Sequence, residues 1–375
     1  MKKVYDIYLQ LLRTALWSSE QQPLPELTAG ELQQLVAINM QQKTAPLVFP
    51  QLLADEHADV QTKPLRMHMQ AACVQTMQHQ VRLQQTLQQV WTVLQDAGIQ
   101  PVLLKGASLA ALYREPQLRA WGDIDLFVGK KRYHEACDAL RKAFPDAEEL
   151  YEEEECYKHY NLVIDGVMIE LHHVTSVIER PIDKWLHRKI ERRGMAPERL
   201  RHIQLNGFDV VVPEPTFYAL FVFMHSWEHL RNTGVLLRQL CDLALLLHHY
   251  GNDIDRKQLR HDLRLMNLTK LWQIYMFVLV NNLGLPKEEA PFYSDACSQR
   301  AEVLLTDMLG GKIEIPAHEQ RTFSNRLLRK IYTMQCRMKE AERIGRYNPA
   351  YAFRKKIQIL LHGATRLFAK DTVKA

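Results

Sequence analysis

The start of the chain repeats apolar residues at helical spacing. One stripe consists of Val4, Ile7, Tyr8, Leu11 and Leu12. A second stripe lies in a Gln-rich run and comprises Leu83, Leu87, Val90, Leu94 and Ala97. Intervals of three and four residues place such side chains on one face of a helix. Pro64 suits the first turn of the second helix and Gly98 its end, and Thr28 is placed to cap a helix that begins near Glu31. We therefore predict a helical N-terminal region over residues 1–98.

Short apolar runs and turn residues replace this pattern over residues 99–213. A strand is predicted at 101–104, followed by a turn at Lys105-Gly106, a helix, and a strand that contains Asp123-Ile124-Asp125. A further helix is predicted over 131–144, and the acidic run 148–155 is interpreted as a solvated loop.

Two dipeptides in the same region predict β-hairpins. Asp165-Gly166 separates the runs 157–164 and 167–173, in which apolar positions alternate with others. Asn206-Gly207 likewise separates 202–205 from 208–212. Both dipeptides favour the tight turns that join antiparallel strands.

Helical spacing returns after Pro213 and continues to the end of the chain. Helices are predicted at about 216–232, 234–250, 255–265 and 268–284, with several more in the last residues. The predicted fold is α+β, with a small mixed β-sheet core at 99–213, flanked by the N-terminal helices and by a helical C-terminal domain at 214–375.

The composition is that of a soluble globular protein, with 47% apolar and 24% charged residues. Asp6, Gln10 and Arg13 interrupt the apolar residues near the start, so we expect no signal peptide. No apolar run approaches the length of a membrane-spanning helix. The six cysteines show no C-x-x-C spacing, which indicates reduced thiols and a cytoplasmic protein.

Positive charge is concentrated at the C-terminus. Residues 321–375 contain 14 Lys and Arg against 3 Asp and Glu, whereas the rest of the chain contains 34 against 40. Such a basic arm either meets phosphate, in RNA or another polyanion, or lies against the acidic body. An apolar stripe that includes Ile357 and Leu360 is expected to be buried on the C-terminal helices, with the basic face left exposed.

Asp123 and Asp125 are the first candidates for chemistry. Alternate residues on a strand share a face, so the two carboxylates point the same way and need a counter-charge. Mg²⁺ is the usual one, because it takes oxygen ligands and keeps sites for phosphate. Gly106 lets the backbone approach a ligand, Ser108 lies at the following helix N-terminus, and Lys105 and Arg119 add cationic donors. The alternative is a solvated turn or a structural ion pair.

Glu170 lies at the centre of an apolar strand, on the same face as Met168 and His172. An unpaired carboxylate is expensive to bury, so Glu170 requires a partner. Either a metal ion or an arginine would serve.

The order of these residues resembles a known motif. It is written K-G-x-[ST], then Tyr, then Arg, then G-D-I-D-L, and its members here are Lys105, Gly106, Ser108, Tyr113, Arg119, Gly122, Asp123, Ile124, Asp125 and Leu126. The motif is similar to that of an uncharacterised bacterial nucleotidyltransferase family in the DNA polymerase β-like superfamily. The resemblance is strong over residues 100–175 and thinner elsewhere.

The resemblance implies a metal-dependent nucleotidyltransferase. Asp123, Asp125 and Glu170 would hold two Mg²⁺ ions, or Mn²⁺, and transfer an NMP group from an NTP to an unknown acceptor hydroxyl. Lys105, Gly106 and Ser108 would bind the nucleotide phosphates, and Arg119 would offset charge on the leaving pyrophosphate. Accessory positions matched by the resemblance are His159, His172, His225, Arg238 and Asp242.

Three points remain open: a zinc hydrolase, the role of one charged pair, and a catalytically silent module. His225, Glu228 and His229 match the H-x-x-E-H pattern of a zinc hydrolase, with two histidines one helical turn apart. Arg238 and Asp242 are spaced for an intrahelical ion pair or for a pair that faces the nucleotide. A catalytically silent module that binds nucleotide or RNA would retain the same motif.

Overall fold

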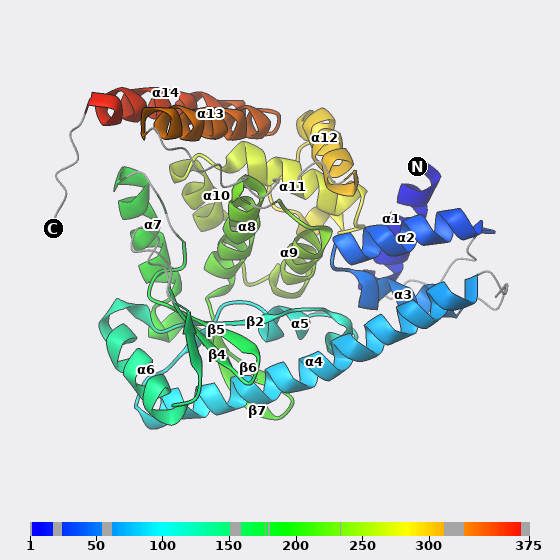
Figure 1. The fold of residues 1–375 in the computed structure, drawn as a ribbon, viewed down its shortest axis with the longest axis horizontal. Helices are drawn as coiled ribbons and strands as arrows, with labels where there is room; N and C mark the ends of the chain where they lie inside the picture. Colours follow the sequence, from blue (N-terminus) through cyan, green and yellow to red (C-terminus); the bar gives the residue numbers. More distant parts are fainter. Residues whose placement is uncertain are drawn as a thin grey trace.

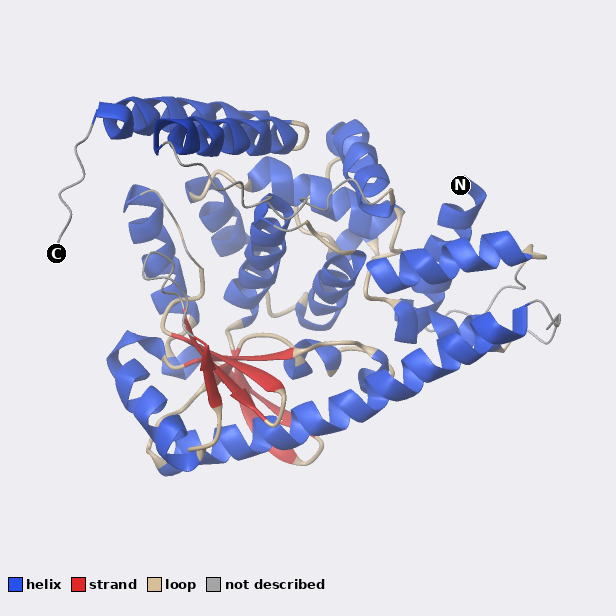
Figure 2. Cartoon of the chain, in the orientation of Figure 1, coloured by secondary structure: helices blue, strands red, loops and turns tan. Residues whose placement is uncertain are grey.

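The computed structural model describes residues 2–17, 25–54, 62–150, 159–176, 178, 181–232, 234–310 and 326–368. A small β-sheet lies between a long N-terminal helix and a layer of C-terminal helices (Figures 1 and 2). The predicted α+β class, with a small mixed sheet flanked by helices, is confirmed.

The described residues of the N-terminal region include the helices α1 (Lys2–Trp17), α2 (Ala29–Gln41), α3 (Ala45–Leu53) and α4 (Lys63–Asp96). The predicted cap of α2 is confirmed, since the Thr28 hydroxyl accepts the Glu31 N–H and the Glu31 carboxylate accepts the Thr28 N–H. Helix α4 ends before Gly98, whose φ of +68° suits glycine. It is about 50 Å long and runs beneath the sheet (Figure 1).

The main sheet has five strands in the order β1-β2-β5-β4-β3. Their bounds are β1 (Val102–Leu103), β2 (Asp123–Phe127), β3 (Glu148–Leu150), β4 (His159–Ile164) and β5 (Val167–His172). Strands β2 and β5 are parallel, and the other neighbours are antiparallel. The β4–β5 hairpin turns at Asp165 and Gly166, both at positive φ, which confirms the hairpin prediction for the described residues.

The prediction of a loop at 148–155 was wrong for its first part. Glu148, Glu149 and Leu150 form the edge strand β3, paired with β4. An edge strand keeps one side in water and therefore tolerates charge, and Arg141 pairs with Glu149 at 2.8 Å. Residues 151–155 lie outside the described part, as do residues 157 and 158 of the predicted first hairpin strand.

Helices α5 (Ala107–Ala110), α6 (Gly129–Ala143) and α7 (Pro181–Gly194) connect the strands. The second predicted hairpin is confirmed as a separate sheet of β6 (Arg201–Leu205) and β7 (Phe208–Val212), which turns at Asn206 and Gly207. Among the described residues, 3-10 helices are η2 (Pro116–Leu118), η4 (Pro197–Arg199), η5 (Lys287–Glu289) and η6 (Asp295–Cys297).

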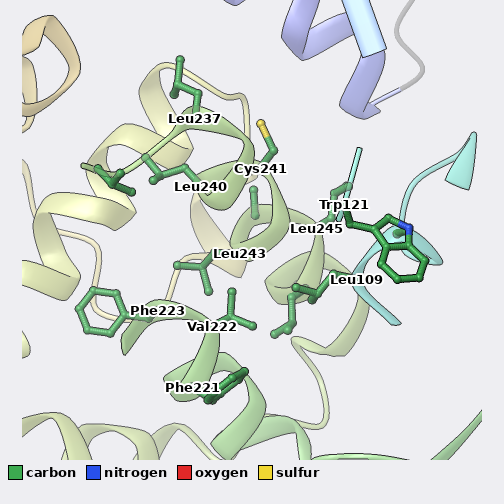
Figure 3. Packing of buried hydrophobic residues seen from close by; sticks show 14 of the residues in the cluster. Leu109, Trp121, Phe221, Val222, Phe223, Leu237, Leu240, Cys241, Leu243 and Leu245 are labelled. Atoms are coloured by element: carbon green, nitrogen blue, oxygen red, sulfur yellow. The ribbon is translucent and has the colours of Figure 1, made fainter. Parts of the chain in front are cut away.

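The C-terminal region is helical, as predicted. Its helices are α8 (Pro215–Asn232), α9 (Leu237–Tyr250), α10 (Arg256–Leu265), α11 (Thr269–Asn281), α12 (Ser298–Leu309), α13 (Arg326–Gly345) and α14 (Pro349–Phe368). Figure 3 shows Leu243 of α9 near Val222 of α8, within the buried apolar cluster that these helices share with Leu109 of α5. Among the described helices none combines the length and the apolar character needed to cross a bilayer.

Both ends of the chain share one core. Trp17 of α1 donates to the Leu283 carbonyl (2.5 Å), and Gln42 donates to the Met308 carbonyl (2.9 Å) while accepting the Leu237 N–H (2.9 Å). A single cluster of buried apolar side chains extends from α1 to the start of α14. Because the parts share this core, the predicted domain boundaries after residues 98 and 213 stay a prediction.

The expectation for the C-terminal stripe was wrong at two residues. Helix α14 packs against α13 through the face that carries Ala352 and Ile359. Ile357 and Leu360 lie away from that face and are 42% and 55% exposed. The side chains from residue 361 onward lie outside the described part.

The junction of α7 and α8 generates a stability prediction. A Cβ added at Gly194 would lie 2.2 Å from the Phe217 Cβ, so Gly194→Ala should destabilise the fold by about 1–3 kcal/mol. The control is Gly30→Ala in α2, where nothing lies within 4 Å and a gain of roughly 0.4–1 kcal/mol is expected. Chemical denaturation measures both. A Gly194→Ala protein as stable as the original would show that the two helices do not pack this closely.

Candidate active site

Parallel pairing of β2 and β5 brings the three predicted carboxylates together. Asp125 lies opposite Glu170 in the register, and Asp123, two residues before Asp125, lies on the same face of β2. One carboxylate oxygen from each of Asp123, Asp125 and Glu170 lies within 4.8 Å of those of the other two. The negative charges of these three carboxylates repel one another unless a cation neutralises them.

Lys105 supplies a positive charge within this group. Its Nζ lies 2.6 Å from Asp123 Oδ2 and 2.6 Å from Asp125 Oδ2. Burial alone would lower the pKa of Lys105, but the charges of Asp125, Asp123 and Glu170 outweigh burial and raise that pKa above its ordinary value. The side chain is therefore a charged ammonium held between two carboxylates.

The turn after β1 positions this lysine. The Leu104 N–H donates to the Asp125 carbonyl (3.0 Å), so Lys105 leaves the sheet directly beside the aspartates. Gly106 follows with φ +75°, and a Cβ there would lie 2.9 Å from the Trp121 ring and 3.2 Å from the Asp123 carbonyl oxygen. Both the backbone conformation and the close approach require glycine at this position.

Glu170 has a histidine partner. His172 Nε2 lies 3.3 Å from Glu170 Oε2 and 3.0 Å from Asp125 Oδ1. Burial alone would raise the pKa of Glu170, but the hydrogen bond with His172 and the charge of Lys105 lower it below its usual range. Among the described residues no arginine forms an ion pair with Glu170, so the expected arginine alternative is not the one observed.

His159 joins this group from the next strand. It lies directly opposite His172 in the β4–β5 register, and the two ring centroids are 4.9 Å apart. Of the accessory histidines, His159 and His172 are thus brought to the carboxylates.

Ser108 has a different environment from the one expected. It is buried, and its hydroxyl lies 2.8 Å from the Tyr218 hydroxyl of α8. Its side chain therefore connects α5 to α8. The binding of nucleotide phosphates by Lys105, Gly106 and Ser108 stays a prediction.

Arg119 and Asp242 form a buried ion pair. Arg119 Nε and Nη2 donate to the two Asp242 carboxylate oxygens at 3.0 and 2.5 Å. The Tyr113 hydroxyl donates to Asp242 Oδ1 at 2.8 Å. Arg119 is 3% exposed, and its guanidinium is engaged in this pair, which gives it a structural role. Its role at the leaving pyrophosphate stays a prediction.

Arg238 does not form the intrahelical pair with Asp242 that its spacing allowed. Its Nη1 donates to the Ala120 carbonyl at 2.5 Å, while Asp242 is engaged by Arg119. Burial, followed by the like charge of Arg119, lowers the pKa of Arg238. Together the three residues fasten the segment before β2 to α9, which spacing along one helix could not reveal.

His225 and His229 lie one turn apart on α8, with their Nε2 atoms 3.0 Å apart. Within the described ranges, two groups of three side chains are arranged to hold a metal ion, and neither contains His225, Glu228 or His229. The orientation of His225 toward the nucleotide stays a prediction.

Comparison with known proteins agrees with the motif. The model of a family described as uncharacterised nucleotidyltransferase matches residues 28–284. The chain belongs to this nucleotidyltransferase family. The crystal structure of an antigenic nucleotidyltransferase-like protein from Paracoccidioides brasiliensis is similar over 58% of this chain and 96% of that chain, with 17% identity and a TM-score of 0.35. No curated protein matches the chain.

The matched range places the candidate site inside the nucleotidyltransferase family's own region. It includes both aspartates, Glu170 and the partners Arg119 and Asp242. Helices α12, α13 and α14 lie beyond it.

The lysine between the aspartates generates a metal-linked prediction. Lys105→Met leaves buried Asp125 without its cation and should destabilise the metal-free protein by about 1–3 kcal/mol. Mg²⁺ should then raise the melting temperature of the variant more than that of the original. Thermal unfolding in EDTA and in Mg²⁺ measures this, with Lys130→Met, an exposed lysine on α6, as the control. An equal response to Mg²⁺ in all three proteins would argue against a shared cation position.

The buried ion pair of Arg119 and Asp242 generates a stability prediction. Asp242→Asn keeps the shape but leaves Arg119 and Arg238 buried without their counter-charge, which should cost about 3–5 kcal/mol. Asp209→Asn, an exposed residue on β7, is the matched control and should change stability by less than about 0.5 kcal/mol. Denaturant titration distinguishes them, and equal midpoints would contradict the structural role.

Proposed function

We propose that this protein is a metal-dependent nucleotidyltransferase, which moves an NMP group from an NTP to an acceptor hydroxyl and releases pyrophosphate. The observation that carries the proposal is the convergence of Asp123, Asp125 and Glu170 around Lys105. Membership of the nucleotidyltransferase family supports it independently.

Asp123, Asp125 and Glu170 would hold Mg²⁺, or Mn²⁺, as a pair of ions. The fit is supported by the donors themselves, since a cation, the Lys105 ammonium, already lies between the two aspartates. Carboxylate oxygens are the ligands that these hard dications prefer. When bound, the ions would polarise the triphosphate and lower the pKa of the attacking hydroxyl.

Lys105 would change partners during binding. An ammonium and a dication cannot share the same two carboxylate oxygens, because their charges repel. Lys105 would therefore leave Asp123 and Asp125 if a metal ion took those oxygens, and the triphosphate is the anion that would receive it. The first backbone N–H groups after Gly106 lie beside it and would bind a phosphate oxygen.

The transfer itself is a displacement at phosphorus. The acceptor oxygen forms a bond to the α-phosphorus, the bond from that phosphorus to the bridging oxygen breaks, and pyrophosphate leaves with the electron pair. The hydroxyl proton passes to solvent. The chain's own residues mainly position the reactants and neutralise charge, as is usual in phosphate chemistry.

The arrangement also supports a place in the DNA polymerase β-like superfamily. In that layout a Gly-Ser turn opens a helix, a D-x-D strand follows, and a third acidic residue comes from a later strand. Gly106 and Ser108, then β2, then Glu170 on β5 follow this order.

An RNA acceptor is the favoured substrate class within this proposal. The observation behind it is the basic surface of α13 and α14, on which Arg337, Lys339 and Arg354 are exposed. Binding through such contacts would weaken steeply with salt. Lys370 and the other basic residues after 368 lie outside the described part.

Replacing one metal-binding carboxylate should abolish transfer. Asp125→Asn is expected to lower the rate at least about 1,000-fold, equivalent to ~4 kcal/mol of barrier. The assay incubates the protein with Mg²⁺ or Mn²⁺ and each α-labelled NTP, with and without cellular RNA, and measures labelled acceptor and pyrophosphate. Asp138→Asn, an exposed aspartate on α6, should retain the original rate.

Two results would redirect the proposal. Nucleotide binding without pyrophosphate release for any NTP or acceptor would identify a catalytically silent module. Stoichiometric zinc in the purified protein, lost in His229→Ala, would instead favour the hydrolase pattern of α8.

A further inference from the structure

Beside the three carboxylates lies a second group of metal-binding donors. His159 is opposite His172 across the β4–β5 pair, and directly opposite residues of antiparallel strands share a face. Glu170 is two residues from His172 on β5 and so shares that face as well. One donor atom from each of the three residues lies within 4.8 Å of the other two.

We propose that His159, Glu170 and His172 form a second metal position, which binds a first-row transition-metal dication such as Mn²⁺ in preference to Mg²⁺. The proposal deepens the proposed function, since it assigns a metal class to part of the same site. It is nevertheless a statement about metal binding and is tested without transfer.

The chemistry of the donors sets the preference. Two imidazole nitrogens and one carboxylate suit Mn²⁺, Fe²⁺, Co²⁺ and Zn²⁺, whereas Mg²⁺ takes oxygen ligands and keeps most of its water. The all-carboxylate group of Asp123, Asp125 and Glu170 has the opposite character. The sheet thus presents an oxygen position next to a mixed nitrogen and oxygen position.

Glu170 connects the two positions. It is a member of both groups, and its two carboxylate oxygens allow it to bridge a pair of ions. Paired metal ions in phosphoryl-transfer sites are roughly 3.5–4 Å apart, a distance that one bridging carboxylate spans. The parallel register that sets Asp125 against Glu170 therefore also fixes how the two positions adjoin.

His172 has a competing role as a positioning residue for Asp125. Its Nε2 lies 3.0 Å from Asp125 Oδ1 and can either donate a hydrogen bond there or offer its lone pair to a metal, but not both at once. If His172 served only to hold Asp125, its imidazole would supply no nitrogen to a bound ion, and His159 would be the remaining nitrogen donor of the group. This difference makes the proposal directly measurable.

The test uses the full chain loaded with Mn²⁺ and pulsed electron paramagnetic resonance, which detects nitrogen atoms bound to the ion. We expect nitrogen coupling in the original protein and its loss, or a change in its number of nitrogens, in His159→Gln and His172→Gln. Mn²⁺ affinity should fall more than about 10-fold in each variant. His202→Gln, an exposed histidine on β6, should match the original in both measurements. Circular dichroism verifies that each variant is folded.

The measurement on the original protein decides the question even if a variant fails to fold. Mn²⁺ bound without nitrogen coupling, coupling to an unchanged number of nitrogens in both variants, or no Mn²⁺ binding would each overturn the proposal. Nitrogen coupling without any nucleotidyl transfer would support the metal position and count against the proposed function. Nucleotidyl transfer with Mg²⁺ but no nitrogen coupling with Mn²⁺ would support the proposed function and count against the second metal position.

Discussion

The parallel pairing of β2 with β5 is the constraint on which the site depends. It sets Asp125 beside Glu170 on one rung of the sheet, and strand alternation adds Asp123 on the same face. Three carboxylates so close together are unstable without positive charge, and Lys105 provides it at 2.6 Å from both aspartates. The turn at Gly106 exists because Lys105 must leave β1 at that point, close to Trp121 and the Asp123 carbonyl. Sheet register, turn and counter-charge are thus one arrangement.

Within the proposed function, Lys105 would also link the binding of metal to the binding of nucleotide. If a metal ion took the place of the ammonium between Asp123 and Asp125, Lys105 would lack a partner until a triphosphate bound. Nucleotide binding relieves this cost, so each ligand should favour the other, and the coupling is reciprocal by linkage. A metal-free protein remains stable for the same reason, since the lysine neutralises the carboxylates in the meantime.

Local patterns in the sequence predicted the helices, both hairpins and the carboxylates, because strand alternation and turn chemistry depend on neighbouring residues. The partners of the motif's other polar residues could not be predicted in this way. Arg119 and Asp242 are 123 residues apart in the sequence, and Ser108 and Tyr218 are 110 apart. Spacing along one helix or strand carries no information on such long-range contacts. The exposed face of α14 was missed for a related reason, since an amphipathic stripe does not reveal how much of it α13 covers.

The buried pair of Arg119 and Asp242 gives a charged residue of the motif a structural role beside the candidate site. It connects the segment just before β2 to α9, and therefore fixes the position of the strand that carries Asp123 and Asp125. Both partners fall within the range that matches the nucleotidyltransferase family, whereas α13 and α14, which carry the exposed basic surface, lie outside it. The match therefore bears on the carboxylates and their supports but not on the basic arm. Recognition of an acceptor through that arm would be a property separable from the chemistry of the sheet.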